Sequence, residues 1–411
     1  MLRFRRFPQA LLSVLLISLL GAGAAEAAGR RGTSPKARAA APVGAPAPEC
    51  AAALLMEAAT GQILYAENPD REWIPASVVK LMLLCLTDEA LAAGRVALDD
   101  SVTASARAQA QGGSQVYLTA GETTSLRALI EAMAVGSAND ATMALAEHLF
   151  GSADAAVAAM NARAERLGMA RTHYVNVTGL PERKGPDSRT TARDQALLAR
   201  EIVLRRPGVL AWTRLQETEF RPGLRLDCTN TLLRRDLGVD GLKTGYHGQA
   251  RFNLVGTAER AGRRLITVVF GSPNAGTRNR VTARLLERGY GEWLLVTGLG
   301  AGEGFGEEFP VDGGWRRSVP VLAGQALRFA VRPAEAARVR IRLAEGARLQ
   351  APLKSGQVLG EIQATLDGQL LASVPAVAGR SVWRRWFGKG EATGKAAWPE
   401  LPAPTASRSG I

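Results

Sequence analysis

The feature that most constrains this chain is a segment near residue 80 that is apolar on almost every face. Residues 77–86 read SVVKLMLLCL, and Pro75 stands two positions before them. Proline is common at the first position of a helix, and a helix that is hydrophobic all round must be covered on every side. We therefore expect a helix buried inside a domain, with Ser77 and Lys80 among its apolar residues.

Strand-like and helical patterns alternate around this helix in an order that predicts an α/β domain over residues 49–305. Apolar segments at 51–56 and 62–65 flank Ala59-Thr60-Gly61, which indicates a β-hairpin. Strands at both ends with helices between them predict a sheet whose outer strands come from opposite ends of this region. The expected helices are 126–149, 155–167 and 191–202, and the later strands are 241–244, 252–257 and 265–270.

A small all-β domain is expected over residues 306–378, where the helical signal fades. Residues 338–343, with the sequence RVRIRL, alternate strictly between polar and apolar side chains. Residues 361–366 and 370–374 are joined through Asp367-Gly368, a dipeptide typical of hairpin turns.

Both ends of the chain have the composition of segments that lie outside folded domains. Three arginines precede an apolar run at 10–20 and small residues ending in AEA, the pattern of a signal peptide over residues 1–27. The apolar run is shorter than the roughly 20 residues that a spanning helix needs. Residues 28–48 are expected to form a flexible linker, and residues 391–411 a disordered tail.

An excess of positive charge and one basic, aromatic segment indicate an anionic surface as a partner. The formal net charge is +13, aromatic residues make up 5%, and no recognition motif for nucleic acid is present, so nucleic acid is not expected. Residues 379–390 contain the run VWRRWFGK, where helical spacing places Trp383 and Trp386 near one face. Such a segment suits a lipid interface. The alternative is a strand or helix end packed on the β-domain.

The cysteines and histidines do not have the spacing of a metal site. The three histidines lack partners at ligand spacing, and neither a metal nor a cofactor is expected. Cys50, Cys85 and Cys228 are an odd number, so at most one disulfide can form among them. Cys85 lies in the apolar helix and is expected to be a core residue, whereas pairing of Cys50 with Cys228 stays open.

Three short motifs carry side chains suited to acyl transfer. Ser77 and Lys80 are three residues apart on one helix face, where an amine kept neutral by burial can take the serine's proton. Ser137-Ala138-Asn139 adds a hydroxyl and a carboxamide at the end of a helical run. Lys243-Thr244-Gly245 lies on a predicted strand whose edge can pair with an extended peptide, with the glycine allowing close backbone approach.

In this order the motifs resemble the S-x-x-K, S-D-N and K-T-G elements of penicillin-binding proteins and class A β-lactamases. The chain is similar to the low-molecular-mass penicillin-binding proteins that act as serine-type D-alanyl-D-alanine carboxypeptidases. The similarity covers residues 48–305 well and extends more loosely to about residue 378. The stretches that carry it are TGQILY (60–65), PASVVK (75–80), SANDA (137–141), HYVNVTGL (173–180) and VDGLKTGY (239–246).

The resemblance implies a penicillin-binding, β-lactamase-like catalytic domain that removes the terminal D-alanine from peptidoglycan stem pentapeptides. β-Lactam antibiotics are then expected as covalent inhibitors. It implies that the catalytic residues are Ser77, Lys80 and Ser137, that the substrate-binding residues are Asn139, Lys243, Thr244, Gly245 and Arg278, and that the backbone N–H groups of Ser77 and Tyr246 form the oxyanion hole. It also implies a periplasmic protein that residues 379–390 hold on the outer face of the inner membrane.

The sequence departs from the family pattern in two places. His247 and Arg251 follow K-T-G where a small or hydroxyl residue and a glycine are usual, which can alter specificity. Thr229 occupies a position where some relatives carry an arginine, so part of the carboxylate site is expected to be built differently.

Three alternative functions use the same fold. A β-lactamase is disfavoured because there is no convincing glutamate motif between Ser137 and Lys243 and because the β-domain is foreign to that class. A D,D-endopeptidase that cuts cross-links shares the chemistry, but such relatives commonly lack the β-domain. An inactive peptidoglycan-binding scaffold is disfavoured because all three motifs are intact.

Overall fold

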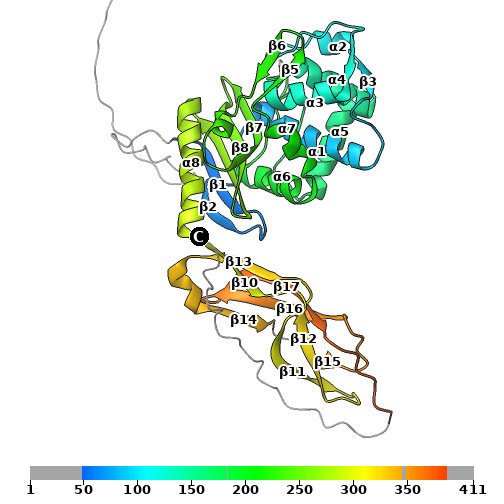
Figure 1. The fold of residues 1–411 in the computed structure, drawn as a ribbon, viewed down its shortest axis with the longest axis vertical. Helices are drawn as coiled ribbons and strands as arrows, with labels where there is room; N and C mark the ends of the chain where they lie inside the picture. The colour runs from blue at the N-terminus through cyan, green and yellow to red at the C-terminus, as the bar shows by residue number, and fades with distance from the viewer. Residues whose placement is uncertain (1–48, 183, 345–348, 387–411) are drawn as a thin grey trace, which may run out of the picture. The chain divides into compact units, whose positions relative to one another are not determined.

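The computed structural model describes residues 49–182, 184–344 and 349–386. The expected signal peptide, linker and tail lie outside the described residues, as do residues 387–390 of the expected membrane segment. A mixed α/β domain is followed by an all-β domain, which confirms the predicted fold class (Figure 1).

A five-stranded antiparallel sheet in the order β2-β1-β9-β8-β7 forms the centre of the first domain. Its edge strands, β2 and β7, come from opposite ends of the domain sequence, as expected. In the middle of the sheet, β1 pairs with β9, with Leu54 opposite Val268. The strands are β1 (Ala52–Glu57), β2 (Ile63–Glu67), β7 (Val239–His247), β8 (Arg251–Arg260) and β9 (Arg263–Ser272).

Helices cover both faces of this sheet. Alternate side chains of a strand point to opposite faces, so each strand contributes to two layers. In β1, Leu54 and Met56 belong to the core shared with the helices between β2 and β7. Ala53 and Leu55 instead pack against α8 (Ala275–Glu292). Figure 1 shows α8 on one side of the sheet and the other helices on the opposite side.

The helical layer surrounds α1 (Lys80–Ala92), which is buried over most of its length as the sequence predicted. None of the described helices combines the length and the apolar character needed to cross a bilayer. The other elements of this layer are η1 (Ala76–Val79), α2 (Ala106–Gln109), α3 (Leu126–Glu131), η2 (Ala132–Gly136), α4 (Asn139–Phe150), α5 (Ala153–Arg166), α6 (Ala192–Arg205), α7 (Gly208–Thr213) and η3 (Thr231–Arg234). Two small two-stranded sheets, β3 (Ser101–Thr103) with β4 (Thr123–Ser125) and β5 (Glu217–Arg221) with β6 (Leu224–Asp227), complete it.

The expected single helix over 126–149 is wrong, because the chain breaks in its middle. After α3, one π-helical turn, η2, leads to Ser137, whose φ of 60° lies in the left-handed region. A right-handed helix cannot continue through that conformation. Helix α4 therefore starts afresh at Asn139. The break falls on the second motif and places Ser137 at the end of η2 and Asn139 at the start of α4.

The second domain consists of strands around a core of its own, and they pair antiparallel except for β15, which pairs with β11 in parallel. A six-stranded sheet has the order β14-β16-β17-β12-β11-β15, and β10 pairs with β13 beside it. The hairpin predicted through Asp367-Gly368 joins β16 to β17. The elements are β10 (Leu294–Leu299), β11 (Gly304–Asp312), β12 (Ser318–Ala323), β13 (Leu327–Val331), η4 (Pro333–Arg338), β14 (Val339–Leu343), β15 (Leu349–Gln350), β16 (Val358–Leu366) and β17 (Gln369–Ala378).

The second domain extends beyond its expected bounds of 306–378 at both ends. Leu299 of β10 belongs to its core, and so does Val382, which is 1% exposed. Residues 382–384 are extended, with Val382 bridged to Leu353 and Arg384 to Gly314. The helix expected in residues 379–390 is therefore wrong for the described part, because the backbone pairs with the β-domain instead.

A buried ion pair links β1, β9 and the end of α8. Glu57 is fully buried, and its carboxylate accepts from Arg263 Nε at 2.7 Å. Arg263 Nη1 also donates to the carbonyl oxygen of Trp293 at 2.7 Å. Removing one partner of such a pair leaves the other charge buried and uncompensated.

Arg263→Met is therefore expected to lower the free energy of unfolding by about 3 kcal/mol. Guanidinium denaturation followed by circular dichroism measures this change. The double variant Glu57→Gln/Arg263→Met is the matched control and should recover part of the loss. A double variant no more stable than Arg263→Met would contradict this role of the ion pair.

Candidate active site

Ser77 and Lys80 of the first motif lie on consecutive helical turns inside the catalytic domain. Ser77 belongs to the 3-10 helix η1, and Lys80 is the first residue of α1. Ala76 precedes them with a left-handed φ of 49°. Lys80 Nζ lies 3.0 Å from Ser77 Oγ. The two side chains are thus in contact, although the turn that carries Ser77 is 3-10 rather than α-helical.

The Lys80 amine is fully buried and has two further partners. Its Nζ donates to Asn139 Oδ1 and to the carbonyl oxygen of Thr178, both at 2.7 Å. Burial lowers the pKa of Lys80 well below its usual value, and the positive charge of Lys243 lowers it further. A neutral amine has two N–H groups and one lone pair. The two acceptors therefore leave the lone pair for the hydroxyl of Ser77.

Asn139 is held in place at both ends of its carboxamide. Its Oδ1 accepts from Lys80, and its Nδ2 donates to the carbonyl oxygen of Gly112 at 2.7 Å. The backbone N–H of Asn139 donates to the carbonyl oxygen of Ser114 at 2.7 Å. Ser137, two residues earlier, is 6% exposed, and its hydroxyl makes no hydrogen bond within the described part of the chain. Ser137 is thus free to contact a bound substrate.

The third motif lies on β7, an edge strand of the sheet that runs beside η1. A Cβ atom at Gly245 would lie 2.4 Å from the carbonyl oxygen of Pro75 and 3.1 Å from the backbone nitrogen of Ser77. Contacts that short do not occur in stable structures. Only glycine therefore lets β7 approach the nucleophile's turn this closely.

Two buried basic side chains, Lys243 and Arg278, lie at the other end of the site. Lys243 is 1% exposed, and among the described residues its Nζ donates only to the carbonyl oxygen of Thr244, at 3.3 Å. Burial lowers the pKa of Lys243 to about 8, and the charge of Arg278 contributes to the decrease. Arg278, 3% exposed in the first turn of α8, has its pKa lowered by burial to about 10.

These cations have no carboxylate partner within the described residues, although buried charges are normally paired. The Thr229 hydroxyl is hydrogen-bonded to that of Thr244. At the position where some relatives carry an arginine, this chain thus has a neutral hydroxyl. The excess of buried positive charge makes this end of the site complementary to a small anion such as a carboxylate.

Two polar residues without a predicted role, Asn176 and Asp140, shape the segments around the site. Asn176 Oδ1 accepts from the N–H of Gly179 at 2.6 Å, in the loop whose Thr178 carbonyl binds Lys80. A Cβ atom at Gly179 would lie 2.1 Å from the carbonyl oxygen of Ala76, and its φ is +77°. Glycine is thus required beside the nucleophile's turn. The stretch HYVNVTGL, which carries part of the family resemblance, contains these loop residues and was the available signal.

Asp140 is the other such residue, and it orders the loop opposite Ser77. It is fully buried, and its carboxylate accepts from the N–H groups of Val116 at 3.1 Å and Leu118 at 3.0 Å. Because Asp140 is adjacent to Asn139, the same helix start holds both the loop and the carboxamide. Its signal in the sequence was the stretch SANDA.

The two residues that follow K-T-G differ in exposure. Tyr246 is 60% exposed, and its ring stacks on Phe252 with a centroid distance of 4.2 Å. His247 Nδ1 accepts from the N–H of Ala250 at 3.3 Å, and burial lowers the pKa of His247. The imidazole therefore stabilises the turn between β7 and β8 in its neutral form.

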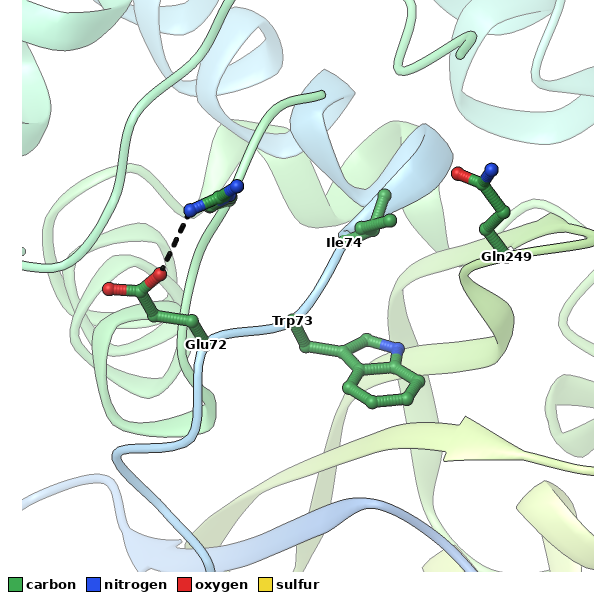
Figure 2. A pocket seen from close by; sticks show the side chains of 5 residues that line it. Glu72, Trp73, Ile74 and Gln249 are labelled. Carbon is green, nitrogen blue, oxygen red and sulfur yellow. Dashed lines mark ion pairs between the residues drawn. The ribbon is translucent and has the colours of Figure 1, made fainter. Parts of the chain in front are cut away.

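A separate cavity of about 350 Å³ lies beside the segment that leads to Ser77 (Figure 2). Its lining includes Trp73, Ile74 and Gln249, together with an ion pair between Glu72 and Arg189 at 3.6 Å. A neighbouring cavity of about 490 Å³ shares this ion pair. Neither is lined by a residue of the three motifs, so neither is the catalytic cleft.

The described residues contain no cluster of side chains that could hold a metal ion. Cys50, Cys85 and Cys228 are all buried and free. A serine beside a buried amine, facing an edge strand that carries a lysine, defines a serine acyl-transfer site of the penicillin-binding type.

Comparisons with known proteins agree with this class. The family model for D-alanyl-D-alanine carboxypeptidase matches residues 39–274, and the model for the C-terminal domain of penicillin-binding protein 5 matches residues 297–384. DacF of Bacillus subtilis is 30% identical, covering 82% of this chain and 87% of the relative. DacC of Escherichia coli is 32% identical, covering 83% and 86%. The chain therefore belongs to the D-alanyl-D-alanine carboxypeptidase family of penicillin-binding proteins.

Solved structures support the same assignment. Penicillin-binding protein 5 from Haemophilus influenzae has a TM-score of 0.76 and 30% identity, covering 82% of this chain and 99% of that one. Penicillin-binding protein D2 from Listeria monocytogenes, solved with ampicillin bound, has a TM-score of 0.54 and 34% identity, covering 59% and 98%.

Proposed function

We propose that Ser77 is the acylated nucleophile of a serine-type D-alanyl-D-alanine carboxypeptidase that acts on peptidoglycan stem pentapeptides. The observation that carries this assignment is the buried Lys80 amine, 3.0 Å from Ser77 Oγ and with a lowered pKa. A serine hydroxyl is a weak nucleophile until a neighbouring base takes its proton. Lys80 is the only amine in contact with Ser77 within the described residues.

In the first step, the Lys80 lone pair accepts the proton of Ser77 as Oγ attacks the carbonyl carbon between the two D-alanines. The negative charge that develops on the carbonyl oxygen is stabilised by the backbone N–H groups of Ser77 and Tyr246. When the C–N bond breaks, the proton passes to the leaving amine through Lys80 and Ser137. Water then hydrolyses the ester on Ser77, which releases the shortened peptide and restores the hydroxyl.

Specificity for a free substrate carboxylate follows from the positive charge at the Lys243 end of the site. The terminal carboxylate of the substrate is bound by Lys243 and the hydroxyl of Thr244, with Arg278 contributing positive charge. Asn139 holds the peptide amide on the opposite side. The substrate backbone lies along the free edge of β7, as an added strand does.

β-Lactam antibiotics are proposed as covalent inhibitors through the same acylation step. A lactam presents a carbonyl to Ser77 and a carboxylate to Lys243. Its leaving nitrogen stays attached after the ring opens, which retains the acyl-enzyme.

An endopeptidase that cuts cross-links is the second candidate function, because it uses the same nucleophile and base. The carboxypeptidase is favoured by the family model for D-alanyl-D-alanine carboxypeptidase, which matches residues 39–274, and by the C-terminal β-domain, which matches that of penicillin-binding protein 5.

The wild-type enzyme is expected to remove one alanine from a purified stem pentapeptide, and the Ser77→Ala variant should remove none. Mass spectrometry of the peptide before and after incubation measures this loss. Fluorescent penicillin should label the wild type covalently and leave Ser77→Ala unlabelled. Lys80→Ala should slow acylation by about 10²–10⁴-fold, the usual contribution of a positioned base. Labelling of Ser77→Ala at the wild-type level would refute the nucleophile assignment. Cleavage of cross-linked dimers alone would identify an endopeptidase.

The pH dependence of kcat/KM should have two limbs. Activity rises with pH as Lys80, whose pKa is lowered, loses its proton and becomes a base. Activity on a peptide with a free carboxylate falls above about pH 8, where Lys243 loses the charge that binds the carboxylate. The matched control is the C-terminal amide, which should lack the alkaline limb. An alkaline limb of equal size for both peptides would contradict the role of Lys243.

We further propose that the protein is exported by residues 1–27 and attached peripherally to the outer face of the inner membrane through residues 379–390. Support comes from the exposed Trp383 and Trp386, which are 76% and 86% exposed beside two arginines. Indole rings favour the headgroup level of a bilayer, and guanidinium groups pair with lipid phosphates.

High salt or alkali should therefore release the protein from isolated membranes, because a short basic segment binds reversibly and partly by charge. Immunoblots of pellet and supernatant after each wash measure the release. Retention in the pellet through both washes would contradict peripheral attachment.

A further inference from the structure

A second tryptophan-rich element lies beside the C-terminal segment, at the turn between β11 and β12. This turn reads GGWRRS, and its Trp315 is 71% exposed. Arg316 and Arg317 in the same turn are exposed as well. A single exposed ring is common on protein surfaces, but exposed rings that gather in one place and are rimmed by polar groups mark an interaction site.

The turn and the C-terminal segment are joined by backbone hydrogen bonds. Trp315 N–H donates to the carbonyl oxygen of Trp383 at 2.9 Å, and Arg385 N–H donates to that of Gly313 at 2.8 Å. A Cβ atom at Gly314 would lie 2.6 Å from Val382 Cγ1, so glycine permits the close approach. The two segments thus form one surface, at the end of the domain where β11, β12 and β15 meet (Figure 1).

This surface has a rigid base. Val382 is buried in the core of the β-domain, and its N–H and carbonyl groups are both hydrogen-bonded to Leu353, at 2.9 and 2.8 Å. The backbone that carries the exposed side chains is therefore already ordered before the surface binds a partner. The surface, which we call the Trp–Arg end, consists of Trp315, Arg316, Arg317, Trp383, Arg384, Arg385 and Trp386.

We propose that the Trp–Arg end as a whole binds anionic lipid headgroups, and that the Trp315 turn is a membrane contact in its own right beside the C-terminal segment. The inference rests on the membrane attachment proposed above and adds a contact more than 60 residues earlier in the chain. Four exposed arginines are complementary to lipid phosphates, which they bind with paired N–H groups. Three indole rings beside them match the layer where headgroups meet acyl chains.

A bilayer fits this surface better than a folded protein partner. The three indoles are 71–86% exposed, so they protrude instead of lining a groove. Each segment carries two adjacent arginines next to tryptophan, so apolar and cationic groups are mixed over the surface. A headgroup layer offers phosphates and apolar carbons at similar depth, whereas protein interfaces concentrate apolar residues in a core with a polar rim.

The test measures sedimentation of the purified full-length protein with lipid vesicles. One vesicle is phosphatidylcholine alone, and the other contains roughly 30% phosphatidylglycerol to provide a negative surface potential. The wild type should bind the anionic vesicles more tightly. Arg316→Gln and Arg317→Gln should each weaken binding by about fivefold. Trp315→Ala should weaken it and should abolish the blue shift that Trp315 contributes on binding.

Two matched controls lie elsewhere on the β-domain. Leu370→Ala removes an apolar side chain that is 57% exposed, and Arg328→Gln removes an exposed arginine of β13. Both should bind as the wild type does. Penicillin labelling should be unchanged in every variant, which establishes that the catalytic domain is folded.

Each remaining outcome overturns a distinct part of the inference. Wild-type protein that binds neither vesicle refutes membrane attachment itself, and with it this inference. If Trp383→Ala weakens vesicle binding but the three variants of the Trp315 turn bind as the wild type does, only the contribution of the turn is refuted. Equal binding to both vesicles refutes selection for anionic headgroups. If the Trp315-turn variants bind vesicles as the wild type does but lose binding to purified cell-wall polymer, the turn binds that polymer instead. If they lose self-association instead, the turn binds a second copy of the chain.

Discussion

A single buried amine joins the parts of the chain that make the site. Lys80 Nζ contacts Ser77 on the turn before it, Asn139 at the start of α4 and the Thr178 carbonyl in a distant loop. An amine in that position must either be neutral or lose the solvation of its charge, and burial favours the neutral form. The contacts that hold the three segments together therefore also make Lys80 a base.

The glycines beside Ser77 allow this convergence. Gly245 brings the edge strand against the Pro75 carbonyl, and Gly179 brings the loop that carries Thr178 against Ala76. With β7 this close, Lys243 lowers the pKa of Lys80, and Arg278 lowers that of Lys243. Backbone packing thus sets both the geometry of the cleft and the electrostatic potential that an incoming carboxylate meets.

The β-domain contributes none of the three motifs and instead determines how the C-terminal segment is presented. Its core extends from β10 to Val382, so the C-terminal segment leaves the domain from a paired, extended backbone instead of a free helix. That pairing brings Trp315 and Trp383 together although they are far apart in the sequence. The helical spacing predicted for Trp383 and Trp386 is therefore wrong, although both side chains are exposed as the prediction requires.

The sequence by itself determined what depends on local spacing. The spacing of three positions from Ser77 to Lys80 is about one helical turn, the apolar run around them requires burial, and the alternation in residues 338–343 requires a strand. Only the tertiary structure decided the break at Ser137, the roles of Asp140 and Gly179, and the start of the β-domain at β10 rather than residue 306. These features come from contacts between segments distant in the chain, and a left-handed residue or a close backbone approach leaves no periodic pattern in the local sequence.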